Sequence, residues 1–175
     1  MDLTHGEMAP ATVHAVARNR VLVQVAYACG LRISELVALT WGQVIRREDG
    51  KVQLNVLGKG NKPRQVLLPE VVSNALLKLR GDAGDDAPIF ANPAGGRLTD
   101  RAVNYMLKGA AERAGLPGGF SAHWLRHAHA SHAIDHGAAL PVVQSTLGHG
   151  NIAVTSGYLH ARPGDSSGLH LDPGV

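Results

Sequence analysis

The chain has few of the features that mark secreted or membrane proteins. Its 175 residues include one cysteine, Cys29, so no internal disulfide can form, and this usage fits a reducing cytoplasm. No apolar run approaches the roughly 18 residues of a membrane span. The N-terminal sequence MDLTHGEMAP lacks the basic-then-apolar order of a signal peptide. These absences predict a cytoplasmic protein without a membrane partner.

The chain also lacks a strong charge of either sign. Lys and Arg number 17 against 14 Asp and Glu, which leaves a net charge of +3. This excess slightly favours polyanionic partners but is too small to identify one. A hydrophobic content of 45% is typical of one globular domain with a buried core and argues against disorder.

Apolar residues at helical spacing occur along most of the chain. One such face consists of Val16, Leu22, Val25, Ala26 and Cys29. Gly30 follows as a helix-ending residue. The expected helices cover residues 13–29, 31–40, 70–80, 100–114, 122–136 and 140–147. Tyr27 and Tyr105 fall within two of them, where we expect both to be packing residues.

The middle of the chain changes to strand periodicity. Residues 52–56 alternate apolar and polar side chains, which is typical of a half-buried strand. The basic turn GKGNKPR at 58–64 leads to a second apolar run at 65–68, and the two runs together predict a hairpin. Residues 41–47 can add a third strand. We therefore predict an α+β fold that is mainly helical, with a small three-stranded antiparallel sheet.

Residues 120–158 hold six of the ten histidines, namely His123, His127, His129, His132, His136 and His149. In a helix, His123, Arg126 and His127 approach one face. Histidines four residues apart can bind zinc, but the glutamate of an HExxH site is absent and Arg126 would disfavour a cation. A scaffold role, by hydrogen bonding or capping, is favoured for His127, His129, His132 and His136.

Two further polar groups have simple explanations when each is taken alone. Arg32 and Glu35 stand three residues apart, as in a surface ion pair that contributes little to stability. Tyr158 lies among polar residues beside His160 and Arg162, and a core or surface role would be its simplest explanation.

Taken together, six residues form a set suited to phosphodiester chemistry. An in-line attack places negative charge on the nonbridging oxygens, which arginine stabilises because its planar fork pairs with two oxygens. A tyrosine hydroxyl can attack once a base or positive surroundings remove its proton, and a lysine can protonate the departing sugar hydroxyl. The set that supplies these groups without a metal consists of Arg32, Lys59, His123, Arg126, His149 and Tyr158.

Several motifs resemble, in the same order, the catalytic domain of the tyrosine recombinases, the phage-integrase and Xer-type family. They are ACGLRISELVALTW, LGKGNKPR, SAHWLRHAHASH and LGHGNIAVTSGY. The similarity covers about residues 20–159. It implies the tyrosine recombinase catalytic-domain fold and site-specific DNA strand exchange through a 3′-phosphotyrosyl intermediate.

The resemblance also implies a role for each matched residue. The scissile phosphate would be held by Arg32, Arg126 and His149. His123 would be the general base, Lys59 the general acid and Tyr158 the nucleophile. Glu35 would orient Arg32 rather than react.

The same resemblance implies the partners and the absence of a cofactor. Double-stranded DNA would be the substrate. The basic residues of the turn can simply be a solvated loop, and the alternative is that Lys62 and Arg64 contact DNA. The chain would self-associate on DNA as a tetrameric synapse. No ATP, metal or other cofactor is implied, because the phosphotyrosine link retains the bond energy for religation.

The family pattern predicts three regions: an N-terminal arm or linker remnant at 1–19, a catalytic domain at 20–160 and a flexible tail at 161–175. Family members usually carry a helical core-binding domain before the catalytic one. Because only some twenty residues precede the match, we expect a domain fragment or a shortened protein. The tail has few apolar residues and two prolines, which disfavours a helix that docks on a neighbour.

Other functions remain open from the sequence. A type IB topoisomerase shares the tyrosine chemistry but relaxes supercoils, although the GKGNKPR turn and the LGHG motif look more like integrases. A DNA-binding module without catalysis is another alternative, but no residue of the catalytic set is missing. A metal-binding histidine protein is the least favoured.

Overall fold

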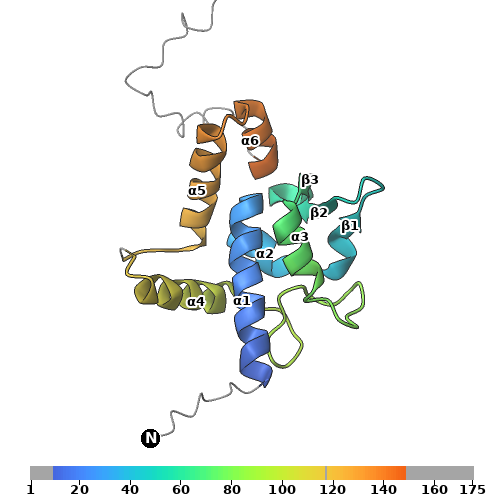
Figure 1. Ribbon diagram of the computed structural model, residues 1–175, viewed down its shortest axis with the longest axis vertical. Coiled ribbons are helices and arrows are strands. Elements are labelled where there is room, and N and C mark those ends of the chain that lie inside the picture. The colour runs from blue at the N-terminus through green and yellow to red at the C-terminus, as the bar shows by residue number, and fades with distance from the viewer. Residues whose placement is uncertain (1–9, 117, 149–175) are drawn as a thin grey trace, which may run out of the picture.

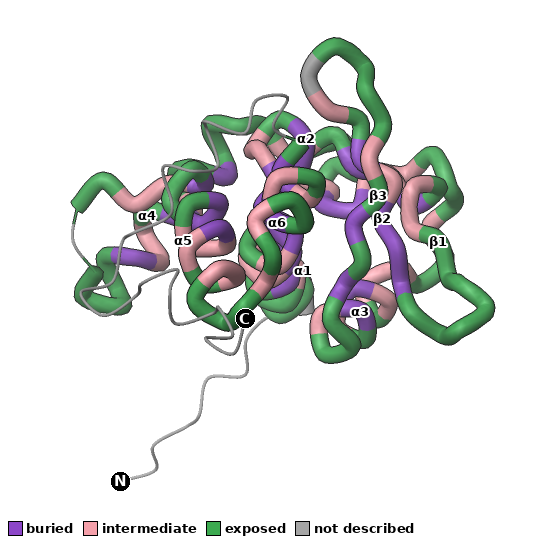
Figure 2. The backbone as a smooth tube through the Cα atoms, turned by 90° about the horizontal axis from the view of Figure 1, so that it is seen from above, coloured by how far each residue is buried: buried purple, intermediate pink, exposed green. Residues whose placement is uncertain are grey.

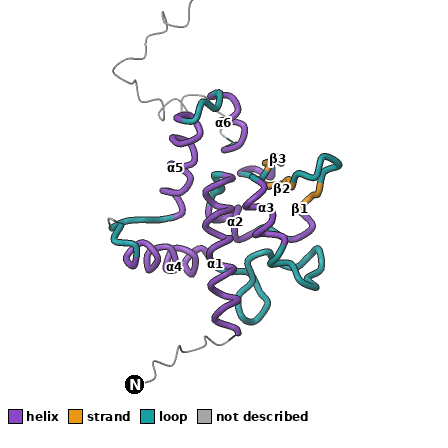
Figure 3. The backbone as a smooth tube through the Cα atoms, viewed as in Figure 1, coloured by secondary structure: helices purple, strands orange, loops and turns teal. Residues whose placement is uncertain are grey.

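The computed structural model describes residues 10–116 and 118–148, except for the side chains of residues 10–12 and 59. The elements are α1 (Pro10–Cys29), α2 (Ile33–Ala38), η1 (Trp41–Gln43), β1 (Val44–Arg46), β2 (Val52–Leu57), η2 (Lys59–Asn61), β3 (Pro63–Leu67), α3 (Glu70–Leu77), α4 (Asp100–Arg113), α5 (Ala122–Asp135) and α6 (Leu140–Leu147), where η denotes a 3-10 helix. The predicted fold class, mainly helical with three antiparallel strands, is confirmed (Figure 3). No helix within the described ranges is long and apolar enough to cross a membrane.

Helix α1 runs through the middle of the described structure (Figure 1). Helix α5 packs on one side of α1, while α3 and the sheet lie on the other. Helices α5 and α6 pack together near the C-terminal end of α1, and α4 contacts both α5 and α2. Segments from both halves of the sequence therefore meet around the end of α1.

The buried face of α1 agrees with the predicted one except near its start. Leu22, Val25 and Cys29 are fully buried, whereas Val16 is 53% exposed because this part of α1 borders an open groove toward α3. Most exposed positions of the sheet lie in the loops that join its strands (Figure 2). The helix begins at Pro10, three residues before the predicted start, and proline suits a first helical turn because its missing N–H would be unpaired there. The boundary predicted between arm and catalytic domain, after residue 19, falls inside this one helix.

Gly30 ends α1, as predicted, and also permits a close approach between helices. Its φ of +57° is in the left-handed region that favours glycine. A Cβ atom at this position would lie 2.5 Å from Cδ2 of Leu147 and 2.9 Å from Cδ2 of His129. The absence of a side chain therefore lets the α1–α2 junction pack directly against α5 and α6.

The central strand β2 pairs antiparallel with both β1 and β3. Its apolar residues are buried as predicted, namely Val52, Leu54 and Val56. Gln53 is also buried, so the expectation of a half-buried strand is wrong at this position. Arg47 donates to Oε1 of Gln53 at 3.0 Å, and the Gln53 amide donates to Oδ1 of Asn55 at 2.8 Å. These bonds give the buried amide of Gln53 hydrogen-bond partners in place of water.

Three other local predictions differ from the structure. The third strand covers only β1, because residues Trp41–Gln43 form a 3-10 turn with Trp41 buried. Tyr105 is 81% exposed rather than packed, because the buried positions of α4 are Val103, Leu107 and Ala111. Tyr27 is 39% exposed, and its hydroxyl hydrogen-bonds with His132.

Candidate active site

A small pocket of about 220 Å³ brings together residues from two segments that are distant in sequence. Arg32 lies directly before α2, while His123 and Arg126 lie one turn apart in the first part of α5. The rest of the lining consists of Leu31, Ile33, Asn104, Ser121 and Ala122. Half of the predicted catalytic set therefore shares one pocket.

Glu35 attaches Arg32 to the first turn of α2. The backbone N–H of Arg32 donates to Oε2 of Glu35 at 2.9 Å, and its Nη1 donates to Oε1 at 2.9 Å. Glu35 is only 6% exposed, so the interpretation of a surface ion pair is wrong. The two bonds hold both the backbone and the guanidinium of Arg32 at the edge of the pocket.

Arg64 binds the same carboxylate from strand β3. Its Nη1 donates to Oε1 of Glu35 at 2.9 Å and its Nη2 to Oε2 at 2.7 Å, while Nε donates to the carbonyl oxygen of Thr146 at 2.8 Å. The side chain is 10% exposed. This placement differs from the predicted DNA contact, because these guanidinium bonds are made inside the protein.

The pKa of Glu35 reflects these neighbours. Burial alone would raise it, but the hydrogen bonds and charge of Arg64, together with the bonds from Arg32, outweigh burial and hold it below its usual value. Glu35 is therefore ionised at neutral pH, and its charge is balanced by two arginines.

Arg126 is buried and joins three helices. It is 4% exposed, and it donates through Nη1 to the carbonyl oxygen of Gly30 at 2.6 Å and through Nη2 to that of Leu147 at 2.7 Å. Hydrogen bonds from a charged donor are stronger than neutral ones. They link α5 to the end of α1 and to the end of α6, and they fix a positive charge beside Arg32.

His123 and His127 face each other on α5. Their Nε2 atoms are in hydrogen-bond contact, and the rings meet edge to face with 4.1 Å between centroids. Burial, and then the charges of His123 and Arg126, lower the pKa of His127. A neutral His127 is therefore able to share a hydrogen bond with the predicted general base.

Three further histidines, in or directly after α5, have structural partners. His129 donates from Nδ1 to the carbonyl oxygen of Tyr27 at 2.8 Å, and Nδ1 of His132 lies 2.9 Å from the Tyr27 hydroxyl. His136 donates to the carbonyl oxygen of His132 within its own helix. The predicted scaffold roles of these three residues are confirmed. In residues 10–116 and 118–148, no three His, Cys, Asp or Glu side chains are grouped to hold a metal ion.

The hairpin tip carries Lys59, as predicted. The backbone at Lys59–Asn61 forms a tight turn, in which Gly60 has a φ of +73° and Asn61 a φ of +58°. The N–H of Gly58 donates to the carbonyl oxygen of Lys62 at 2.9 Å and closes the turn. Lys62 is exposed beside it, in a position that remains compatible with the predicted DNA contact.

Two predicted catalytic residues, His149 and Tyr158, lie outside the described residues. Helix α6 ends at Leu147, and Gly148 follows with a φ of +65°. The roles of His149 and Tyr158 therefore stay predictions.

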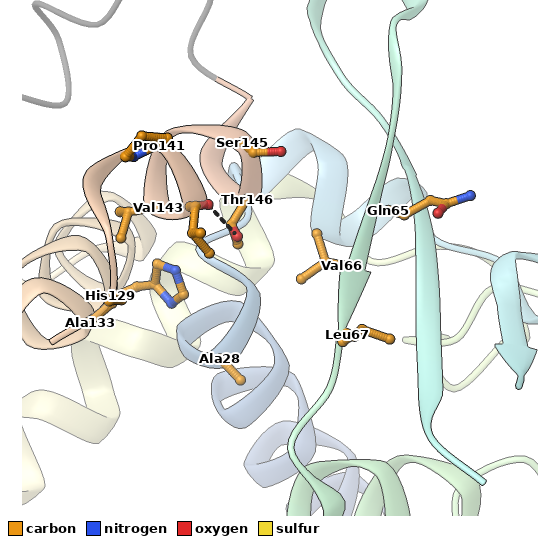
Figure 4. Close-up of a pocket in the computed structure, with 12 residues that line it drawn as sticks. Ala28, Gln65, Val66, Leu67, His129, Ala133, Pro141, Val143, Ser145 and Thr146 are labelled. Carbon is orange, nitrogen blue, oxygen red and sulfur yellow. Dashed lines mark hydrogen bonds between the residues drawn. The ribbon is translucent and has the colours of Figure 1, made fainter. Parts of the chain in front are cut away.

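A larger pocket, of about 600 Å³, lies between α6 and β3 (Figure 4). Much of its wall is apolar, with Val66 on one side and Val143 on the other, and the His129 imidazole also borders it. Its lining includes none of the predicted catalytic residues whose side chains are described. It is therefore separate from the pocket of Arg32, His123 and Arg126.

The fold and the pocket define a helical domain that gathers two arginines and a histidine around a space suited to an anion. The sequence model of the phage integrase family matches residues 7–164 of the chain. The chain therefore belongs to the phage integrase family.

Curated proteins and solved structures of this family are similar to the chain. It is 39% identical over 160 residues to tyrosine recombinase XerD of Pseudomonas aeruginosa, a match that covers 87% of this chain and 53% of XerD. It is 41% identical over 145 residues to XerC of Xanthomonas axonopodis pv. citri, covering 82% of this chain and 47% of XerC. The chain thus spans about half the length of the curated relatives it matches.

A structural comparison gives the same family. The pre-cleavage complex of the site-specific recombinase XerH with its difH substrate superimposes with a TM-score of 0.74 at 28% identity, covering 90% of this chain and 46% of XerH. The fold is therefore that of a tyrosine recombinase catalytic domain.

The role of Arg64 inside the site was missed from the sequence, although a signal was present. Residues two apart in a strand face the same side, and both Val66 and Leu68 are buried. This alternation places Arg64 on the inward side of the hairpin. Asn104 and Ser121 were also missed as lining residues, and no sequence signal singled them out.

Proposed function

We propose that this chain cleaves and rejoins DNA strands at a specific site through a 3′-phosphotyrosyl intermediate. The convergence of Arg32, His123 and Arg126 on one pocket, in a member of the phage integrase family, carries this proposal. Two guanidinium groups suit the nonbridging oxygens of a phosphodiester, which gain negative charge during attack. The similar protein XerH is bound to its difH substrate, which supports DNA as the substrate class.

The reaction exchanges one phosphoester for another. The Tyr158 hydroxyl attacks the phosphorus, its proton passes to His123, and the bond from phosphorus to the 5′ oxygen breaks. Lys59 protonates that oxygen as it leaves. The 3′ phosphate stays on the tyrosine until a 5′ hydroxyl reverses the steps. No bond energy is lost, so the cycle requires neither ATP nor a metal.

The remaining groups stabilise and orient the phosphate. Arg32, Arg126 and His149 bind its oxygens, and Glu35 holds Arg32 in place. The carbonyl bonds of Arg126 keep its charge beside the pocket before DNA arrives, so little reorganisation is needed in the transition state.

The proposed partners are double-stranded DNA and further copies of the chain. Lys62, exposed at the hairpin, contacts the DNA backbone. Exchange between two duplexes requires four strand cleavages, for which four copies assemble as a synapse on the DNA.

A nicked duplex tests the proposal. A sequence retained by the chain is selected from a random pool and rebuilt with a nick beside the cleaved bond, so that the released fragment diffuses away and the adduct accumulates. The wild-type chain is expected to form a covalent protein–DNA adduct stable to detergent, and Tyr158→Phe none. Tyr105→Phe, which alters an exposed tyrosine of α4, is the matched control and keeps wild-type yield. An adduct from Tyr158→Phe, or none from wild type, would contradict the mechanism.

A further inference from the structure

Arg64 connects the two halves of the candidate site. From β3 it reaches the Glu35 carboxylate in α2 and the Thr146 carbonyl in α6. Glu35 in turn holds Arg32. The carbonyl next to that of Thr146, on Leu147, accepts from Arg126. One internal arginine is therefore linked to both of the arginines that line the pocket.

The bonds at Glu35 require a guanidinium. Each carboxylate oxygen accepts one N–H from Arg64 and one from Arg32, so both oxygens are occupied twice. The two parallel bonds from Arg64 have the planar fork geometry that arginine forms with a carboxylate. A lysine is a single point of charge and cannot hold both oxygens in this way.

Two glycines leave room for the Arg64 side chain. A Cβ atom at Gly148 would lie 3.2 Å from its Cδ, and a Cβ at Gly58 would lie 3.2 Å from its Nη1. Gly58 directly precedes Lys59 at the hairpin turn, and Gly148 directly follows α6. The guanidinium is thus enclosed between the segments that lead to Lys59 and His149.

The hydrogen bond from Arg64 to Thr146 connects β3 with α6, and a pocket lies between other parts of these two elements. Figure 4 shows β3 and α6 facing each other across the 600 Å³ pocket. The Thr146 hydroxyl is bonded within α6, to the Val142 carbonyl at 3.0 Å, and Arg64 uses the backbone carbonyl of Thr146. Arg64 therefore holds the end of α6 to the hairpin.

We propose that Arg64 is a positioning residue, which sets Arg32 for phosphate binding by clamping the Glu35 carboxylate and which holds the end of α6 against the hairpin. Arg64 does not touch DNA in this role. The inference rests on the proposed function, because it concerns the geometry of the same site.

The test measures single-turnover cleavage of the selected nicked duplex. Without the clamp, Glu35 and Arg32 are free to shift, and displacements of about 1 Å reduce rates by about 100-fold. Arg64→Met is therefore expected to cleave about 100-fold more slowly than wild type, with DNA affinity unchanged. Arg80→Met is the matched control, because Arg80 also pairs with a carboxylate, Asp85, but lies outside the pocket and keeps the wild-type rate.

A double-mutant cycle separates positioning from general loss of structure. If Arg64 acts in part through Glu35, Arg64→Met reduces the rate by a smaller factor in the Glu35→Gln background than in the wild type. Arg64→Lys keeps the charge without the fork and is expected to remain slow. Urea unfolding of each variant identifies the folded ones, and Arg64→Lys carries the test if Arg64→Met does not fold.

Several outcomes would overturn the inference. They are wild-type cleavage by Arg64→Met or Arg64→Lys, a loss confined to DNA affinity, and losses from Arg64→Met and Glu35→Gln that multiply. If the wild-type chain forms no covalent adduct with the nicked duplex, the proposed function itself is contradicted. In that case NMR titration still tests the clamp, because the pKa of Glu35 should rise in Arg64→Met and an unchanged pKa would refute it.

Discussion

At the scale of single residues, Glu35 is an acidic side chain beside the pocket that we propose binds phosphate. Its oxygens are bonded to Arg32 and Arg64, and it is buried. A buried carboxylate without partners would be costly, and here two arginines offset that cost. Glu35 therefore holds two cationic side chains in place.

This setting predicts a pH dependence of folding stability. The folded pKa of Glu35 is below the unfolded value of about 4.3, so its contribution to stability is present above that value and is lost as pH falls through the folded pKa. Glu35→Gln should cost about 1–3 kcal/mol at pH 7, and its stability should fall less steeply than that of wild type below about pH 4.3. Urea unfolding at pH 7 and at acid pH measures both effects.

Glu48→Gln is the control for this comparison. Glu48 is exposed, so its replacement should leave the unfolding midpoint and its pH dependence close to wild type. If Glu35→Gln kept the same acid-induced loss of stability as wild type, Glu35 would not be held ionised by its arginines.

At the scale of elements, local patterns predicted much of the fold. Helices α5 and α6 and the hairpin lie where periodicity, capping and turn residues placed them, because these signals depend on neighbours in sequence. Burial of polar side chains was not predicted. Glu35, Arg64 and Gln53 are covered by segments distant in sequence, and periodicity does not report such contacts.

In the candidate site, too, local spacing predicted some features, and contacts between distant segments were not predicted from spacing. His123 and Arg126 were predicted to share a face because they lie three apart in one helix, and both line the pocket. Arg32 joins them through the contact of the α1–α2 junction with α5, which only the resemblance to tyrosine recombinases anticipated. The bonds of Arg126 to the Gly30 and Leu147 carbonyls could not be predicted, because they depend on how three helices pack.

The packing of the α1–α2 junction against α5 and α6 can be tested by substitution of Gly30. Gly30→Ala introduces strain from a positive φ and places Cβ 2.5 Å from Leu147. Each effect costs about 1–3 kcal/mol, so the variant should lose about 2–6 kcal/mol of stability in urea unfolding.

Gly50→Ala separates the two effects. Gly50 has a φ of +78°, but no atom lies within 4 Å of a Cβ built there. This control should therefore lose only the conformational part, about 1 kcal/mol. Equal losses in Gly30→Ala and Gly50→Ala would contradict the close packing of the junction against α5 and α6.

At the scale of the whole molecule, the fold gathers the site from segments spread along the chain. α2, the β2–β3 hairpin, α5 and α6 meet around the C-terminal end of α1 (Figure 1). Arg126 links α5 to the residue after α1 and to the end of α6, and Arg64 links the hairpin to α2 and to α6. The arrangement presents positive charge at one place on a chain whose net charge is only +3.

The proposed mechanism requires that Tyr158 becomes covalently joined to DNA. The adduct formed by wild type on the nicked duplex is digested with trypsin and nuclease, and tandem mass spectrometry locates the nucleotide on the peptide. We expect a nucleotide linked through its 3′ phosphate to Tyr158. Attachment to Tyr27, to Tyr105 or to a residue other than tyrosine would contradict the proposed mechanism.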